Sequence, residues 1–198
     1  MYILIYLLSK FAFAELLCTR ASLDSEFAIG DRVPICLFFS AVPNANTAER
    51  VFFEPKVDEY SGIQASGVYE KFQNRTIYLR IQAGEGEISD PVPYIDPNKE
   101  LVGVVYSAVV ILDHGEIDKI EWDNDCGPCS DCLELNDEEV CGEDLCDPGS
   151  YEDCDPKIYV SWMGTDSNGL ALVSAGYRIS QFRKFSLFEV YKEAKSNF

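Results

Sequence analysis

Cysteines and carboxylates, the side chains of this sequence best suited to chemistry, concentrate in one stretch of the chain. Positions 120–156 hold six of the eight cysteines and fourteen acidic residues, with no lysine or arginine. Cys126 and Cys129, separated by Gly-Pro, have the spacing of the reactive pair in disulfide-exchange enzymes. That chemistry needs the first cysteine at a helix N-terminus, whereas positions 130–140 lack an amphipathic helical pattern and dense carboxylates disfavour a thiolate. The motif therefore indicates structural disulfides, with thiol–disulfide exchange as an alternative.

Metal binding is the second chemistry that this stretch suggests. Cys126, Cys129 and Cys132 lie at intervals of three and could supply thiolates to zinc, but an oxidising compartment would convert them to disulfides first. Calcium fits better because carboxylates are the hard oxygen ligands that it prefers. The candidate calcium ligands are Asp123, Asp125, Asp131, Glu134, Asp137 and Glu138. No run matches the twelve-residue EF-hand loop, so a solvated acidic loop without an ion is the alternative.

Hydrolytic chemistry finds little support in the sequence. A Ser-His-Asp triad would have to use His114, the only histidine, which lies beside Asp113 in a predicted turn. There is no Gly-x-Ser-x-Gly motif and no glycine-rich phosphate loop. We therefore predict no enzymatic activity and no cofactor other than calcium, and keep a secreted oxidoreductase or hydrolase as an alternative.

The number of cysteines favours disulfide bonds throughout the chain. We expect all eight to be oxidised, namely Cys18, Cys36, Cys126, Cys129, Cys132, Cys141, Cys146 and Cys154. Cys18 and Cys36 are expected to pair, because the other six lie some ninety residues further on. Six cysteines allow fifteen pairings, so the sequence leaves the connectivity of the acidic stretch open.

The N-terminus and a sequon point to an extracellular compartment. Positions 1–14 form an apolar run ending in Ala-Phe-Ala, which predicts a signal peptide cleaved after Ala14, with a buried N-terminal strand as the alternative. Asn74 begins an Asn-Arg-Thr sequon and is predicted to carry an N-linked glycan. No later apolar run is long enough to cross a bilayer. The expected product is a soluble glycoprotein, secreted or held at the cell surface.

Charge is distributed unevenly along the chain. The net charge is −18, and the acidic stretch supplies −14 of it, which leaves −4 for all other residues. A nucleic-acid partner is not expected, because phosphates require a basic stripe that the sequence lacks. Positions 176–198 carry five cations against two glutamates, a balance of +3; the cations are Arg178, Arg183, Lys184, Lys192 and Lys195. They could bind the acidic stretch of a neighbouring copy head to tail, or neutralise that of their own molecule.

The remaining sequence reads as strands that would position these groups. We expect strands at 32–39, 50–54, 76–82, 101–112, 116–122, 157–162, 170–174 and 185–191, with tight turns at 113–115 and 165–169. In the first strand, Val33, Ile35, Leu37 and Phe39 should share the buried face, with Cys36 and Phe38 opposite. Positions 84–99 hold three prolines and two glycines, so a surface loop is expected there.

These elements predict a single all-β domain over residues 15–198. Many short strands and no long helix favour an antiparallel β-sandwich, with a β-barrel as the alternative. The acidic, cysteine-rich insertion, 123–156, is expected at the tip of a hairpin between 116–122 and 157–162. We predict a self-associating subunit of an extracellular filament, coat or matrix. The alternative is a monomeric binding module, either carbohydrate-directed or toxin-like.

Overall fold

The structure is a computed structural model, and it describes residues 25–43, 49–84, 87–124, 131–135 and 138–177. The larger of its two sheets contains, in spatial order, β10 (Cys132–Leu135), β11 (Glu138–Asp144), β7 (Leu101–Gly103), β6 (Val92–Asp96), β4 (Ile77–Ala83), β1 (Ile35–Ser40) and β2 (Glu49–Phe53), and β5 (Glu87–Ile88) pairs with β4. The smaller sheet contains β13 (Ala171–Leu172), β12 (Lys157–Thr165), β8 (Val105–Asp113) and β9 (Glu116–Trp122), and β3 (Ser61–Gln64) pairs with β12.

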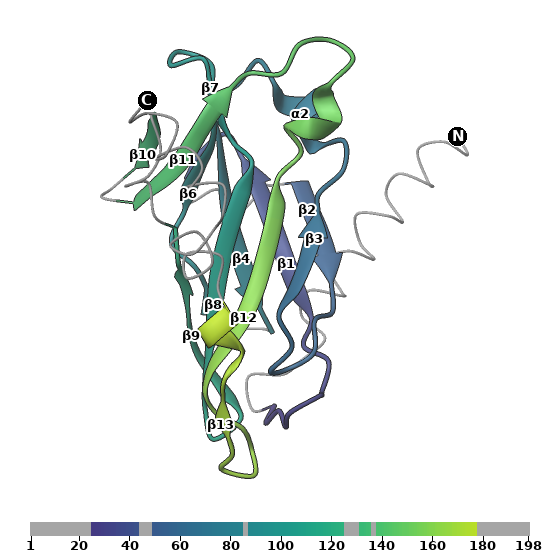
Figure 1. The fold of residues 1–198 in the computed structure, drawn as a ribbon, viewed down its shortest axis with the longest axis vertical. Coiled ribbons are helices and arrows are strands. Elements are labelled where there is room, and N and C mark those ends of the chain that lie inside the picture. The colour runs from purple at the N-terminus through teal and green to yellow at the C-terminus, as the bar shows by residue number, and fades with distance from the viewer. Residues whose placement is uncertain (1–24, 44–48, 85–86, 125–130, 136–137, 178–198) are drawn as a thin grey trace, which may run out of the picture.

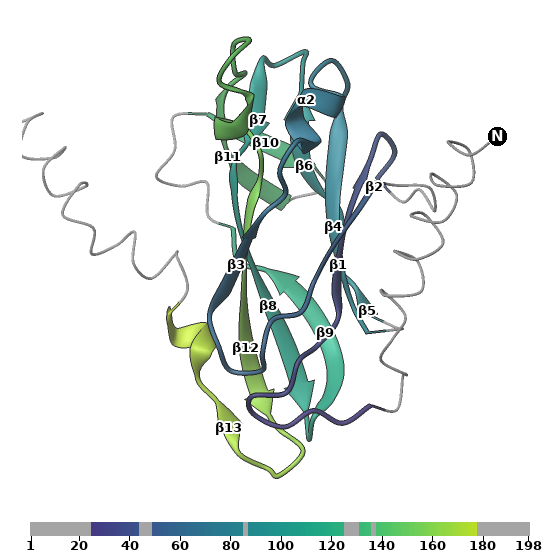
Figure 2. The same ribbon diagram turned by 90° about the vertical axis from the view of Figure 1, so that its right-hand side faces the viewer.

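Short helical turns complete the described chain: α2 (Val68–Phe72), η1 (Tyr151–Asp153) and η2 (Ser174–Tyr177). Figure 1 shows the strands running along the long axis of the molecule, and Figure 2 shows β3 and β12 on one side with β4, β1 and β2 on the other. The two sheets do not close into a barrel in the described residues, so the predicted all-β sandwich is confirmed. None of the helices described is both long enough and apolar enough to cross a membrane.

The core lies between the two sheets and follows the alternation expected of half-buried strands. In β4, Ile77, Leu79 and Ile81 are fully buried, as the sequence predicted. Val33 and the residues alternating with it through β1 belong to the same core, whereas Cys36 and Phe38 form a second cluster with Phe52 on the outer face of the larger sheet. The predicted faces of this strand are confirmed.

Residues 84–99 differ from the expected surface loop, because they contain β5 and β6. Val92, Tyr94 and Ile95 are fully buried despite the prolines between and around them. Pro93 pairs with Tyr78 where the register between β4 and β6 shifts. Such an irregularity tolerates a residue that cannot donate a ladder hydrogen bond.

The valine-rich run expected as one strand at 101–112 is two strands in different sheets. β7 belongs to the larger sheet and β8 to the smaller one, and the chain passes between them at Val104. At Gly103 a Cβ would collide with the hydroxyl of Tyr106, which donates a hydrogen bond to the carbonyl of Pro93 at 2.8 Å. Glycine therefore allows the buried tyrosine to approach the point where the chain changes sheets.

The acidic stretch is placed differently from the expected hairpin tip. β8 lies between β9 and β12, and β12 runs parallel to β8 rather than forming a hairpin with β9. One edge of β8 is taken by β9 through the two-residue turn His114-Gly115, whose φ angles of 50° and 88° suit a tight hairpin. A parallel strand needs a long crossover. The acidic stretch is that crossover, and it adds β10 and β11 to the larger sheet.

Candidate functional site

The acidic crossover forms one end of the sandwich, at the top of Figure 1, near α2 and β7. We call the described residues 131–135 and 138–155 the acidic end. Leu133 and Val140 point into the core and are almost fully buried, whereas Glu134 and Glu139 on the neighbouring rung are exposed. The exposed carboxylates are Asp131, Glu134, Glu139, Glu143, Asp144, Asp147, Glu152 and Asp153. No lysine or arginine lies among the described residues of this end, so it presents negative charge alone.

Electrostatic repulsion is built into the β10–β11 hairpin. Glu134 lies directly opposite Glu139 in the antiparallel ladder, and like charges at this position destabilise a sheet. Partial burial, followed by the nearby Asp90 carboxylate, raises the pKa of Glu138. A positive group placed against this hairpin would relieve both effects.

A disulfide closes a loop within the acidic end, and two tyrosines attach this loop to the core. Cys146 and Cys154 are bonded to each other, which assigns one pair among the six cysteines of the stretch. The backbone N–H of Cys146 donates to the Tyr69 hydroxyl at 3.1 Å, and the Tyr94 hydroxyl donates to the Cys154 carbonyl at 3.0 Å. Burial raises the pKa of Tyr94, which keeps its hydroxyl protonated as a donor.

Asp155 joins this end to the segment around α2. It is 3 % exposed, and its carboxylate accepts hydrogen bonds from the N–H groups of Gly67 at 2.7 Å and Tyr69 at 3.0 Å. Nearby, the Gln64 side-chain amide donates to the Glu152 carbonyl at 2.8 Å. The exposed carboxylates are therefore carried on a braced surface and not on a free loop.

The expected calcium ligands are only partly described. Asp125 and Asp137 lie outside the described residues, as do Cys18, Cys126 and Cys129 among the expected disulfide cysteines. Glu134 and Glu138 occupy neighbouring rungs of the hairpin and so face opposite sides of it. Within the described chain, no group of three or more histidine, cysteine, aspartate or glutamate side chains is arranged to hold a metal ion. Asp123 and Asp131 are described, and they belong to no such group.

Of the remaining cysteines, Cys36, Cys132 and Cys141 are disulfide-bonded. Cys132 therefore supplies no thiolate, which argues against the zinc site considered from its spacing. His114 lies in the exposed β8–β9 turn, with its side chain 80 % exposed and Nδ1 2.7 Å from the Asp113 carboxylate. This is the predicted turn, and it offers no buried cleft for acyl-transfer chemistry.

Asn74 follows α2 and is exposed, as a glycan acceptor must be. The five C-terminal cations, Arg178, Arg183, Lys184, Lys192 and Lys195, lie outside the described residues, so the expected contact with the acidic end is not placed. The expected strand at 185–191 also lies outside them.

The opposite end of the molecule is built from loops that the sequence did not connect. We call residues 27–31, 113–116 and 165–170 the loop end. Phe27 N donates to the Gly115 carbonyl at 2.9 Å, and Ser167 N donates to the Phe27 carbonyl at 3.0 Å. The 1 %-exposed Asp166 carboxylate accepts hydrogen bonds from the backbone N–H groups of Ile29 and Leu170. Sequence reasoning identified the 165–169 turn but not this convergence.

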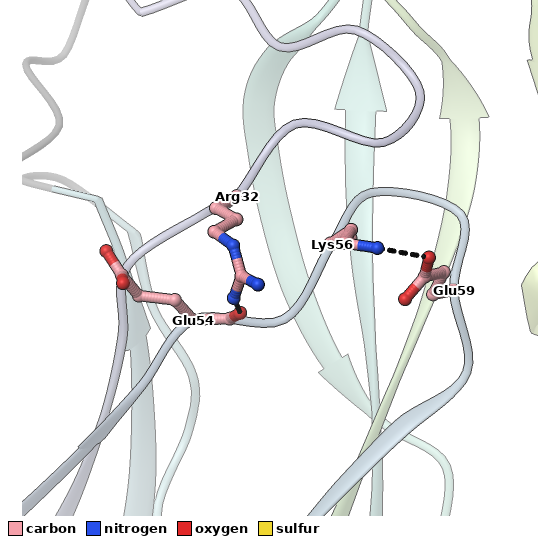
Figure 3. A network of polar contacts seen from close by, with 4 residues as sticks. All are labelled: Arg32, Glu54, Lys56 and Glu59. Carbon is pink, nitrogen blue, oxygen red and sulfur yellow. Dashed lines mark hydrogen bonds and ion pairs between the residues drawn. The ribbon is translucent and has the colours of Figure 1, made fainter.

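Two further polar contacts lie next to the loop end (Figure 3). Arg32 donates from Nη1 to the Glu54 carbonyl at 3.2 Å, and the Lys56 ammonium lies 2.9 Å from the Glu59 carboxylate. Both ion-pair partners are exposed, so this pair adds little stability. The loop end exposes Ile29 and Leu170, and its described residues include no group of three or more histidine, cysteine, aspartate or glutamate side chains that could hold a metal ion.

The chain belongs to the family described as Uncharacterised protein DDB_G0273449, whose model matches residues 87–193, more than half of the sequence. The matched span begins at β5 and includes the whole acidic end and every described strand of the smaller sheet except β3. The searches of curated proteins and of solved structures found no match.

Proposed function

We propose that this family member is a secreted, non-enzymatic interaction protein that binds basic protein surfaces through the acidic end. The observation that supports the proposal is the set of eight exposed carboxylates on the acidic end, with no cation among its described residues. A disulfide and buried hydrogen bonds brace this end. A braced surface loses little conformational entropy on binding, and complementary charge accelerates association.

A basic protein partner explains the hairpin better than a role in folding does. The opposed Glu134 and Glu139 cost stability in the isolated protein, whereas lysine or arginine side chains of a partner would convert that repulsion into attraction. A nucleic acid is excluded as the partner of this surface, because phosphates would add to the repulsion.

The proposal is tested with a fluorescent lysine-rich peptide as the probe. Replacing Glu134, Glu139 and Glu143 by glutamine removes three exposed charges from the acidic end, each worth about 0.5 kcal/mol to a surface ion pair, so affinity should fall about tenfold. The matched control replaces Glu26, Glu59 and Glu87 by glutamine, the same change in net charge away from this end. Equal affinity losses in the two triple variants would mean that only net charge matters and would refute the proposal.

Calcium is the second ligand that we propose for the same surface. The repulsion between Glu134 and Glu139 would favour the binding of calcium as well. An ion that binds only the folded state raises the melting temperature, and the rise grows with the logarithm of the ion concentration above its dissociation constant. We expect a rise with millimolar calcium that chelator reverses and that the triple glutamine variant of the acidic end lacks. No rise in the unmodified protein would remove calcium from the account.

If the C-terminal cations of one copy bind the acidic end of the next copy, the protein self-associates into a filament. This self-association predicts oligomers at low ionic strength that dissociate in high salt, because screening weakens contacts between exposed charges. Size-exclusion chromatography at both ionic strengths measures this. A monomer under both conditions leaves binding of a different basic protein as the function.

Secretion and glycosylation are tested by expression in a secretory eukaryotic host. We expect a chain beginning at Glu15 in the medium, carrying a glycan that is lost in Asn74→Gln. Retention of residues 1–14 in the exported protein, or an unmodified Asn74, would contradict this part of the proposal.

A further inference from the structure

The loop end carries Asn168-Gly169, the one Asn-Gly dipeptide of the sequence. Both residues are exposed, in the turn that joins β12 to β13 at the bottom of Figure 1. Gly169 has no side chain to hinder its own backbone nitrogen, and no described residue beyond its neighbours comes within 4 Å of where a Cβ would stand. The Asn168 side-chain amide therefore has an unhindered backbone nitrogen one residue away.

Hydrogen bonds hold the Asn168 amide against a buried carboxylate. Its Nδ2 donates to Asp166 Oδ2 at 3.3 Å, and its backbone N–H donates to Asp166 Oδ1 at 2.9 Å. Asp166 is 1 % exposed, and its carboxylate also accepts from Leu170 N at 2.8 Å and from Ile29 N at 3.2 Å. One carboxylate thus holds together the turn, the residue before β13 and the N-terminal part of the loop end.

We propose that Asn168 deamidates spontaneously and that the product detaches residues 27–31 from the rest of the loop end. The Gly169 nitrogen attacks the Asn168 side-chain carbonyl carbon and forms a cyclic imide. The amide nitrogen leaves as ammonia, together with the proton that the Gly169 nitrogen loses. Water then opens the imide at one of its two carbonyls, which gives aspartate or isoaspartate at position 168. The reaction consumes water and releases ammonia, so it needs no oxidant and no cofactor.

The product reverses the contact with Asp166. An amide that donates to Oδ2 becomes a carboxylate that can only accept, and two ionised carboxylates this close repel each other. Oδ2 is also the acceptor for Ile29 N, so the repulsion acts on the oxygen that holds residues 27–31. Isoaspartate adds a methylene to the backbone, which also displaces Gly169 N from the Asp166 carbonyl that it contacts at 2.9 Å. Both products should therefore weaken the Ile29 contact.

A second turn that begins in the same way provides an internal control. Asn98 is exposed, and its backbone N–H donates to Asp96 Oδ1 at 3.0 Å, the same type of contact that begins the 166–169 turn. Lys99 follows Asn98 in place of a glycine, and Asp96 is half-buried. The two turns therefore differ in both features on which the proposal depends, the unhindered nitrogen and the buried carboxylate.

Incubation of the folded, secreted protein at mildly alkaline pH, followed by peptide mapping with mass spectrometry, tests the reaction. Asn168 should convert to aspartate and isoaspartate about tenfold faster than Asn98, equivalent to a barrier lower by about 1.4 kcal/mol. A sample unfolded in urea shows the time that conversion takes without the fold. Similar rates at Asn168 and Asn98 in the folded protein would overturn the proposal. An Asn168 that stays intact in the folded protein after the unfolded sample has converted would overturn it as well.

Asn168→Asp reproduces one product and tests its effect on the loop end. Amide hydrogen exchange at Ile29 should become about tenfold faster than in the unmodified protein, equivalent to about 1.4 kcal/mol. Asn168→Ser removes the amide donor without adding charge, and should accelerate this exchange much less. Asn98→Asp adds the same charge to the other turn, and should leave exchange at Ile29 unchanged. If Ile29 exchanges no faster in Asn168→Asp than in Asn168→Ser, repulsion with Asp166 does not loosen the loop end, and the proposal is refuted.

Discussion

Asp155 is one of the groups that attach the acidic end to the rest of the sandwich, and its removal should be costly because it is buried. Its carboxylate is the acceptor for two backbone N–H groups, those of Gly67 and Tyr69, and it is 3 % exposed. Asp155→Ala leaves both donors without a partner. Hydrogen bonds to a charged group contribute about 1.5–3 kcal/mol each, so the free energy of unfolding should fall by at least about 3 kcal/mol. Asp155→Asn keeps one acceptor oxygen and should lose about half as much.

Urea denaturation at pH 7 with disulfides intact measures the effect, with an unchanged slope against urea concentration as the check that only stability changed. Asp153→Ala is the control, because Asp153 is an exposed carboxylate two residues away and should change stability by less than about 0.5 kcal/mol. If Asp155→Ala is as mild as Asp153→Ala, the acidic end is not held by this carboxylate, and the reasoning fails.

Three further predictions concern other parts of the fold. Glu139→Lys should raise the free energy of unfolding by about 0.5 kcal/mol, because it converts the repulsion with Glu134 into attraction. Glu143→Lys is the control, because Glu143 lies opposite Val102 and its replacement should not raise the free energy of unfolding. Chemical denaturation of the two variants measures the difference. Gly103→Ala should lower stability by about 1–3 kcal/mol by displacing Tyr106, and an unchanged melting temperature would contradict the close packing there. Burial acts to raise the pKa of Asp166, but hydrogen bonds from Leu170, Ile29 and Asn168 outweigh burial, so the pKa is lowered. The ionised carboxylate therefore stabilises the fold above the pKa of about 3.9 that it has in the unfolded chain. This stabilisation disappears as the pH falls through the pKa of the folded state. Asp166→Asn should therefore lower the melting temperature at pH 7 by more than at pH 2.5, and an equal loss at both would refute this.

Side-chain alternation was enough to predict the strands whose residues divide cleanly between two faces. Ile77, Leu79 and Ile81 are buried as expected, because β4 lies in the middle of a sheet with one face toward the core. The alternation failed at β6, since Pro93 reads locally as a loop residue and only the shifted pairing with β4 makes it compatible with a strand. The division between β7 and β8 was also hidden, because both halves of the run are apolar.

The composition of the acidic stretch predicted its charge but not its place in the fold. Only Leu133 and Val140 mark β10 and β11 as core-facing strands, and two apolar residues are too few for a periodic signal. The pairing of Cys146 with Cys154 depends on how the chain turns through η1, which the spacing of six cysteines does not encode. The loop end was missed because Phe27, Gly115 and Ser167 come from distant positions and meet only in the folded chain.

The central claim is that the acidic end is the surface that receives a basic protein. Carbodiimide crosslinking of the lysine-rich peptide to the unmodified protein, followed by mass spectrometry, tests it most directly, because the reagent joins amines to carboxylates that they contact. The account predicts that crosslinks concentrate on the exposed carboxylates of residues 131–153. Crosslinks spread over exposed carboxylates of the whole molecule, Glu26 and Glu59 among them, would contradict it.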